Sequence, residues 1–436
     1  MDRGNLTSRG NEIAEIVRTL ADDLSSQGIP EPTFEHGLPA VLQTDAPDSN
    51  ALAARIKLLG LLDELRDLLT DPALLGSPEL RNPSLSILAL VRLKIFEKFP
   101  SEGTTIKDLA QRVSRNENIV RRLMSHAATY HVFYQEQPDF FIHTAGSRIL
   151  SENEGMRTWM LVGLGETMPG ALKIAEAVSQ NNDSEEPQHS VIIPHDHLKC
   201  NFANNKQGWS LQNGTDLPVF QALANMPERA QIFAKAMSWL AQLPGYSPQY
   251  LVDHFPFGSG DITVVDVGGG IGHIARALTD HCPTIQCIVQ DRPEVIFQGE
   301  QALPANLQDR IRFQKHDFFQ PQPVHGADVY LLRHILHDWS NKYARMILQA
   351  LIPALKPGAK IVLNDRIIPG YGEVHYLKER EARDYDMYML ALQNAQERTP
   401  DDWKNLFRDA DPRFKVTRTS QPSKSYLSIM EVTWEG

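Results

Sequence analysis

Two histidines, three residues apart, stand where an apolar segment gives way to polar residues. His334 and His337 follow the apolar stretch 329–332, and Asp338 comes directly after the second histidine. An imidazole has an ordinary pKa of ~6.5 and accepts a proton near neutral pH, whereas a phenol with a pKa of ~10 is scarcely ionised there. A histidine beside a hydroxyl group therefore suits general base catalysis, which contributes roughly 10²–10⁴-fold to a rate. Taken alone, such a histidine is more often structural, so the assignment depends on the rest of the chain.

A glycine-rich turn joins a predicted strand to a predicted helix. The turn contains Asp266, Gly268, Gly269 and Gly270, and it ends at His273. Glycines allow a positive φ and let the backbone approach a ligand without a Cβ in the way. A nicotinamide-binding G-x-G-x-x-G motif counted from the first glycine needs another glycine where the histidine stands. The spacing D-x-G-x-G-x-G therefore predicts a cofactor-cradling loop of a different class.

An acidic residue ends the next predicted strand. Asp291 lies 21 residues past Gly270, where doubly wound folds place an acid that binds ribose hydroxyls. The alternative is a solvated loop carboxylate.

Strands and helices alternate from residue 261 onward. We expect strands at 262–267, 285–290, 311–315, 328–332, 360–363, 414–418 and 426–432. This alternation predicts an α/β fold, a doubly wound parallel sheet with an antiparallel edge at its C-terminal end.

The glycine loop resembles motif I of class I S-adenosylmethionine-dependent methyltransferases. Further segments narrow the resemblance to plant caffeate- and isoflavone-type O-methyltransferases and to fungal enzymes that methylate aromatic polyketides. These segments lie at 289–293, 316–319, 331–340, 360–365 and 396–399. The match covers about 55–436, and its most specific part is the His-Asp-Trp triplet at 337–339. The resemblance implies a Rossmann-like methyltransferase sheet and S-adenosylmethionine as the cofactor.

The resemblance also implies which residues bind this cofactor. In the family, the glycines hold the methionine end, Asp291 binds the ribose, Asp317 accepts from the adenine amine and Phe318 covers the ring. Arg333 stands where many plant relatives have a lysine, so the charge is kept while the donor geometry differs. The predicted cofactor-binding residues are Asp266, Gly268, Gly269, Gly270, Asp291, Arg292, Asp317, Phe318 and Arg333.

The same resemblance implies the catalytic residues. His337 corresponds to the general base of the family, with His334 as the competing candidate. Two acids flank the base in the family, and here they are Asp365 and Glu397. Asp365 departs from the glutamate of plant relatives and is about one methylene shorter, which puts direct contact with the imidazole in doubt. An acid behind the ring fixes the tautomer and stabilises the imidazolium.

The substrate pocket has a weaker signal. Phe233 and Met237 lie one helical turn apart just ahead of the predicted sheet, so their side chains share a face. Each residue predicted to line the pocket could instead pack in an ordinary hydrophobic core. The predicted wall residues are Trp159, Met160, Phe233, Met237, Met387 and Met389.

The N-terminal third is predicted to be helical. Helices are expected at 11–26 and 50–71, the second with a broad leucine face that needs a partner. The stretch 28–50 carries prolines and little periodicity, so we expect an irregular connector there.

Residues 83–150 have the pattern of a small winged-helix unit. One helix is expected at 105–113, a capping box at Ser114-x-x-Glu117 starts the next helix, and a hairpin turns at 137–139. Such a unit binds DNA or mediates dimerisation. The chain lacks a basic stripe, so we favour dimerisation or scaffolding.

These segments predict a domain order. It comprises 1–82, a helical extension and connector; 83–150, a winged-helix dimerisation unit; 151–245, a helical linker and substrate-pocket region with a mobile insertion at 180–190; and 246–436, the S-adenosylmethionine-binding catalytic domain.

Composition excludes several partners. The 436 residues carry a formal charge of −11, which argues against nucleic acid, because such binding relies on clustered Lys and Arg. Cys200, Cys282 and Cys287 have no metal spacing and are too few for a disulfide scaffold. We expect no metal, no membrane span, no apolar leader and a cytoplasmic location.

The sequence as a whole predicts an S-adenosylmethionine-dependent O-methyltransferase. We expect a homodimer that methylates a phenolic or enolic hydroxyl of a small aromatic secondary metabolite, of polyketide origin. The alternative is a pericyclase of the same fold, which keeps the cofactor but uses its sulfonium as a fixed charge. An intact His337 favours methyl transfer.

Overall fold

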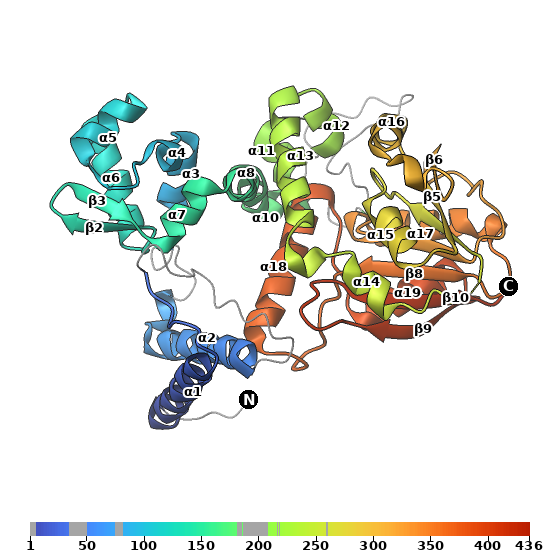
Figure 1. Cartoon of the computed structure of the whole chain (residues 1–436), viewed down its shortest axis with the longest axis horizontal. Coiled ribbons are helices and arrows are strands. Elements are labelled where there is room, and N and C mark those ends of the chain that lie inside the picture. Colours follow the sequence, from blue (N-terminus) through green and yellow to red (C-terminus); the bar gives the residue numbers. More distant parts are fainter. Residues whose placement is uncertain are drawn as a thin grey trace. The chain divides into compact units, whose positions relative to one another are not determined.

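A seven-stranded sheet is the centre of the C-terminal part of the chain (Figure 1). Its strands are β4 (Ile262–Val267), β5 (Ile285–Asp291), β6 (Ile311–Lys315), β7 (Val329–Arg333), β8 (Lys360–Asp365), β9 (Phe414–Ser420) and β10 (Ser428–Trp434). Their order is β6-β5-β4-β7-β8-β10-β9. Strands β4 to β8 are parallel, as the sequence predicts.

The antiparallel strand lies one place in from the edge of the sheet. β10 pairs antiparallel with both β8 and β9, so β9 is the edge strand. The burial of the two strands agrees with this order. β10 is buried along most of its length, whereas every second residue of β9 is exposed. Other layers cover both faces of an inner strand, whereas an edge strand can leave one face to solvent and then alternates.

Helices cover both faces of the sheet because successive strand residues point to opposite sides. Val265 packs into a core with α17 (Asn341–Leu351) and α19 (Pro400–Ala410), whereas Val264 packs into a core with α14 (Gln249–His254) and α15 (His273–His281). The carboxyl ends of the parallel strands meet at one edge, and ligands bind in doubly wound folds at such an edge.

The computed structural model describes residues 6–34, 50–74, 82–180, 185, 208–215, 217, 219–258 and 260–436. The chain divides into two units: 1–166 with 231–239 and 375–377, and 167–230 with 240–374 and 378–436. The finer four-part division expected from the sequence stays a prediction. Most of the expected connector at 28–50 and of the insertion at 180–190 lies outside the described residues, as does Cys200.

The first unit contains two helical groups. α1 (Leu6–Ser26) and α2 (Asn50–Leu69) pair with each other, as the two helices expected there. A second group is built from α3 (Ser84–Arg92), α4 (Ile95–Lys98), α5 (Ile106–Val113) and α6 (Glu117–Ala128) with β1 (Thr104–Thr105), β2 (Phe133–Gln137) and β3 (Phe140–His143). The three strands form an antiparallel sheet in the order β1-β3-β2.

The capping box expected at Ser114 is wrong. Ser114 ends α5 in the left-handed region, with φ 54°, and its backbone N–H donates to the carbonyls of Ala110 and Gln111. The cap of α6 is Asn116, whose side-chain oxygen accepts from the backbone N–H groups of Asn118 and Ile119. An amide oxygen satisfies the first free donors of a helix as well as a hydroxyl does. Asn116 directly precedes the first helical residue and therefore serves as the cap.

In the described residues, ten further helical segments belong to one or other unit or cross a boundary between them in the sequence. They are α7 (Ala145–Glu152), α8 (Glu154–Val162), a π-helical turn (Gly163–Thr167), α9 (Met168–Ala171), α10 (Ile174–Gln180), α11 (Gly208–Asn213), α12 (Val219–Ala224), α13 (Pro227–Ala241), α16 (Pro293–Ala302) and α18 (Tyr376–Gln393). Short 3₁₀ turns lie at η1 (Pro72–Leu74), η3 (Pro244–Tyr246), η4 (Ala305–Leu307), η5 (Leu336–Asp338) and η6 (Ile352–Ala354). Across the described ranges, every helix is too short or too polar to cross a bilayer.

Candidate functional site

The glycine loop after β4 is held against the neighbouring strand. The backbone N–H groups of Gly268 and Gly269 donate to the carbonyl of Gln290, at 2.8 and 3.0 Å. Gly268 has φ 73°, and a Cβ there would clash with Cδ1 of Ile335. Gly270 has φ 60°, and the position of its missing Cβ is open space. The loop thus requires glycine for its backbone conformation and presents an open face.

Asp266 lies directly beneath this loop. Its side chain is buried, and a Cβ on Gly269 would clash with its Oδ2. That oxygen accepts no hydrogen bond from any residue in the described ranges. Burial raises the pKa of Asp266 to about 7, an effect that the positive charge of Arg333 partly offsets. A buried carboxylate oxygen without a donor fits a cationic ligand group.

Asp291 fixes the next turn through both carboxylate oxygens. Oδ2 accepts from the backbone N–H of Gly270 at 2.9 Å, and Oδ1 accepts from the N–H of Arg292 at 2.7 Å. The structure therefore brings Asp291 and the glycine loop together, as the sequence predicts for a shared cofactor site. The Arg292 side chain is exposed and pairs with Glu294, so only its backbone takes part in these contacts.

Asp317 and Phe318 follow the end of β6. Phe318 packs edge to face against Trp339, with ring centroids 6.0 Å apart, and lies 4.0 Å from the Cβ position of Gly268. Asp317 is exposed, and its Oδ1 accepts from the backbone N–H of Phe319 at 3.0 Å. An aromatic wall beside the loop fits a flat ring such as adenine.

Arg333 ends β7 and uses its donors within the protein. Its guanidinium donates to the side-chain oxygen of Asn364 and to the carbonyl of Tyr246. Burial lowers the pKa of Arg333 to about 10, with Asp266 and Asp365 acting in the opposite direction. The side chain therefore stays charged at neutral pH, and it ties β7 to β8 and η3.

His337 lies on η5 among three carboxylates. Its Nδ1 is 3.0 Å from Oε1 of Glu397, and its Nε2 is 3.7 Å from Oδ1 of Asp338. Burial alone lowers the pKa of His337, but Asp338, Asp365 and Glu397 outweigh burial and raise it to about 10. The arrangement stabilises the imidazolium strongly, which is the state a general base reaches after accepting its proton.

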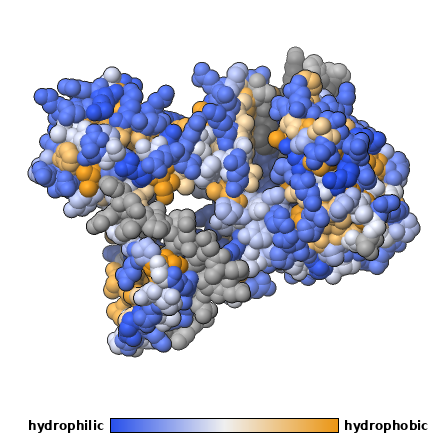
Figure 2. Space-filling view, in the orientation of Figure 1, coloured by the Kyte–Doolittle hydropathy of each residue, from blue (hydrophilic) through white to orange (hydrophobic). Residues whose placement is uncertain are grey.

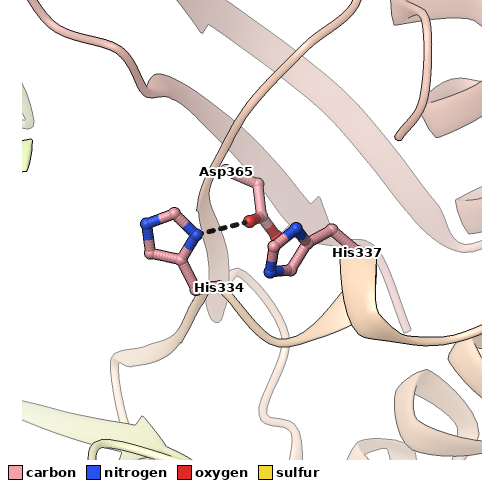
Figure 3. Close-up of side chains that lie close together, drawn as sticks. All are labelled: His334, His337 and Asp365. Atoms are coloured by element: carbon pink, nitrogen blue, oxygen red, sulfur yellow. Dashed lines mark ion pairs between the residues drawn. The ribbon is translucent and has the colours of Figure 1, made fainter. Parts of the chain in front are cut away.

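Asp365 ends β8 between the two histidines (Figure 3). Its Oδ1 is 3.6 Å from Nδ1 of His334, and neither of its oxygens accepts a hydrogen bond within the described ranges. Burial raises the pKa of Asp365 to about 7, whereas the charge of His337 lowers it. Burial and neighbouring cations hold the pKa of His334 well below its ordinary value, so this ring is neutral. The shorter acid thus still faces both imidazoles.

Arg398 is a buried residue beside the site to which the sequence motif assigned no role. It is fully buried, and its guanidinium donates to the carbonyls of Leu336 and Trp339, at 2.8 and 2.7 Å, and to Oδ1 of Asn341 at 3.0 Å. The two carbonyls flank the turn that carries His337. A fully buried arginine is recognisable from sequence only through its neighbour Glu397, because its acceptors lie more than fifty residues away.

The predicted pocket residues fall in both units. Trp159 and Met160 lie on α8, and Phe233 and Met237 lie on α13; all four belong to the first unit. Met160 packs against the core of that unit. The other two candidates, on α18, belong to the second unit, where Met387 is exposed and Met389 is partly buried. The pocket itself stays a prediction.

Comparison with known proteins identifies the family. The profile of the O-methyltransferase domain family matches residues 195–412. The grayanic acid biosynthesis cluster O-methyltransferase of Cladonia grayi is 36% identical over 433 residues, covering 97% of this chain and 87% of the relative. The chlorophenol O-methyltransferase of Trichoderma longibrachiatum is 31% identical over 454 residues, covering 99% of this chain and 91% of the relative.

Solved structures show the same fold. OxaC, in complex with sinefungin and meleagrin, has a TM-score of 0.72 at 21% identity, covering 97% of this chain and 98% of its own. A pericyclic reaction enzyme has a TM-score of 0.69 at 19% identity, covering 97% and 99%. These likenesses show the fold alone, and the family is decided by the sequence relatives. The chain belongs to the O-methyltransferase family.

Proposed function

We propose that this O-methyltransferase transfers a methyl group to a phenolic or enolic hydroxyl of an aromatic secondary metabolite, with His337 as the general base. The supporting observation is the contact between Nδ1 of His337 and Glu397, at 3.0 Å. A carboxylate that accepts from Nδ1–H leaves the lone pair on Nε2, which is then the atom that takes the hydroxyl proton. The reaction product is the methyl ether, and the proton remains on the imidazole until solvent removes it.

S-adenosylmethionine is the methyl donor that the family uses, and it supplies an electrophilic methyl group on a positively charged sulfur. The residues at the strand ends fit it. Asp266 offers a buried oxygen without a donor, Gly270 leaves open space, and Phe318 presents an aromatic face. We assign ribose binding to Asp291, which is supported by its position beside the glycine loop, where it accepts from the N–H of Gly270. We assign cofactor binding to these residues, together with Asp317 and Arg333, as the sequence predicts.

A product assay tests the activity. Purified protein is incubated with labelled S-adenosylmethionine and a panel of phenols, including chlorophenols, which a relative is named for. We expect S-adenosylhomocysteine to accumulate one-for-one with a product that carries one more methyl group. Turnover to an isomer of unchanged mass with intact cofactor would refute methyl transfer and support the pericyclase alternative. A pericyclic reaction enzyme has the same fold, which is why this alternative is tested.

The role of His337 has a separate test. His337→Ala should retain cofactor binding and lose about 10²–10⁴ in turnover, and the loss should shrink for a phenol acidic enough to be ionised at the assay pH. His281, exposed at the end of α15, provides the matched control. An equal loss for weakly and strongly acidic phenols would remove His337 from the proton transfer.

We also propose that the enzyme is a homodimer and that the winged-helix pattern of residues 83–150 belongs to its dimerisation region. The α1–α2 pair supports the homodimer, because several leucines of this pair are exposed. These are Leu59, Leu62, Leu68 and Leu69, and Figure 2 shows apolar surface over this pair of helices. Exposed apolar clusters of this kind mark association surfaces. A cytoplasmic location stays a prediction.

A further inference from the structure

Three side chains at the active site form a cluster with the composition of a transition-metal site. His334, His337 and Asp365 each offer one ligand atom, and these atoms all lie within 4.8 Å of one another. Figure 3 shows the carboxylate between the two imidazole rings, whose centroids are 5.2 Å apart. Two imidazoles and one carboxylate are a ligand set that zinc accepts, with a fourth position left for water.

The spacing is close to what zinc requires. Bonds of ~2.0–2.1 Å in a tetrahedron place neighbouring ligand atoms about 3.4 Å apart. Nδ1 of His334 and Oδ1 of Asp365 are already 3.6 Å apart. The three ligand atoms lie at most 4.8 Å apart, so the widest separation between two of them has to close by about 1.4 Å. Rotation of the two imidazole rings, whose torsions are broad, provides this movement.

The surroundings favour a cation at this point. Asp365 is 2% exposed and both of its oxygens lack a hydrogen-bond donor in the described ranges, so a metal ion would satisfy a carboxylate that is otherwise unpaired. Glu397 accepts from Nδ1 of His337, at 3.0 Å. A carboxylate behind a ligating histidine fixes the ring and raises its basicity, which is the usual outer contact of a zinc-bound histidine. Asp338 adds further negative charge close to Nε2.

We propose that one divalent ion of the zinc class binds to His334, His337 and Asp365 and inhibits the enzyme. The ion takes the lone pair of Nε2 of His337, and any proton on that nitrogen passes to solvent. Binding of the metal stands on the geometry of the cluster alone. Inhibition rests on the proposed function, because the metal occupies the atom that accepts the hydroxyl proton.

Metal binding is tested on tag-free, chelator-treated protein without cofactor. Cobalt(II) is titrated while the visible absorption of a four-coordinate site is followed, and zinc(II) is then added to displace it. We expect one site per chain. His334→Gln and Asp365→Asn should each weaken zinc binding by tenfold or more, and Glu397→Gln by about 10–100-fold. His281→Gln, which changes an exposed histidine, should bind as the wild type does. Equal binding by the wild type and His334→Gln would overturn the assignment.

Inhibition is tested with the methyl-transfer assay. Zinc at the concentration that saturates the cobalt site should abolish turnover of the wild type, and chelator should restore it. Within each variant, the inhibited rate is divided by its own uninhibited rate, so a change in basal activity does not enter. Bound metal with full turnover would overturn the inhibitory role. A metal-free enzyme that methylates no phenol would instead count against the proposed function and leave the binding result intact.

Discussion

The proton chemistry of the site is set by one imidazole among three carboxylates. Asp338, Asp365 and Glu397 surround His337, and their charges raise its pKa to about 10 against the opposing effect of burial. Burial raises the pKa of Asp338 and of Asp365, the latter to about 7. The causes differ, carboxylate charge for the histidine and burial for the two acids, but each shift keeps protons in this cluster to a higher pH than in water. The neutral imidazole needed for catalysis is therefore the form favoured at high pH.

The pH dependence of kcat/KM follows from this. The rate should rise with pH, because the neutral base is required, and the apparent pKa should lie above the ordinary histidine value of ~6.5. Asp338→Asn removes a negative charge 3.7 Å from Nε2 and should move the midpoint to lower pH. Asp309→Asn, at an exposed position, is the control. Identical midpoints in the two variants would contradict the role of the surrounding charges.

Asp291 should be essential for cofactor affinity. A carboxylate that binds ribose hydroxyls makes charge-assisted hydrogen bonds, so Asp291→Ala should weaken S-adenosylmethionine binding by about 1.5–3 kcal/mol. The alanine also releases the N–H of Gly270, which the carboxylate now holds at 2.9 Å. Asp291→Asn keeps an oxygen for that contact and separates the two effects. Calorimetry that finds unchanged affinity in folded Asp291→Ala would remove the residue from the site.

At the scale of elements, the sheet was predictable because apolar runs and their spacing are local properties of the sequence. All seven strands lie within a few residues of the predicted bounds, and β4 and β6 match them fully. The cap of α6 was missed because Ser114 and Asn116 are both good capping residues. Sequence alone does not say that Ser114 adopts the left-handed conformation that ends α5, which leaves Asn116 as the cap. The insertion of β10 beside β8 was also missed, since strand order depends on contacts between distant segments.

Long-range contacts likewise limited the prediction of the site. The motif placed Glu397 near His337 only through a resemblance, because sixty residues separate them. Nothing in the sequence pattern showed that Arg398 turns inward and donates to two carbonyls around η5. Asp365 illustrates the opposite case: its shorter side chain put contact with the imidazoles in doubt, and its position at the end of β8 still brings it to both rings.

Arg398 should act as a positioning residue for the turn that carries the base. Arg398→Met removes the charged donor of the carbonyls of Leu336 and Trp339, although the Leu336 carbonyl still accepts from the N–H of Trp339, and it should cost about 1.5–3 kcal/mol in the free energy of unfolding. Because η5 then loses its anchor, kcat should fall while cofactor affinity changes little. Arg408→Met, on the exposed side of α19, is the matched control.

Arg398→Lys tests the same idea more gently, since it keeps the charge and supplies fewer directed donors. We expect stability and kcat between those of the wild type and the methionine variant. A folded Arg398→Met with unchanged kcat and an unchanged pH profile would show that the arginine contributes to stability alone.

At the scale of the whole molecule, association is the main expectation. Light scattering at micromolar concentration should give roughly twice the chain mass of 49.1 kDa, because the α1–α2 pair exposes leucines that a monomer leaves in water. A charge at the interface should prevent this, so Leu62→Glu combined with Leu69→Glu should yield monomer, while Glu15→Gln, on the exposed surface of α1, should not. A wild-type protein that elutes as a monomer would contradict the dimer.

The position of β10 sets the order in which the protein can fold during synthesis. β10 lies between β8 and β9, yet it follows both in the sequence. Until the ribosome has released residues 428–434, β9 has no partner through which to join the sheet, and the edge of β8 that ends in Asp365 is unpaired. A nascent chain therefore exposes this edge of β8 until β10 is made, and during that time the edge is open to aggregation and to chaperones. A chain that stops before residue 428 would keep every residue assigned to the active site, but the outer edge of β8, the strand that ends in Asp365, would have no partner.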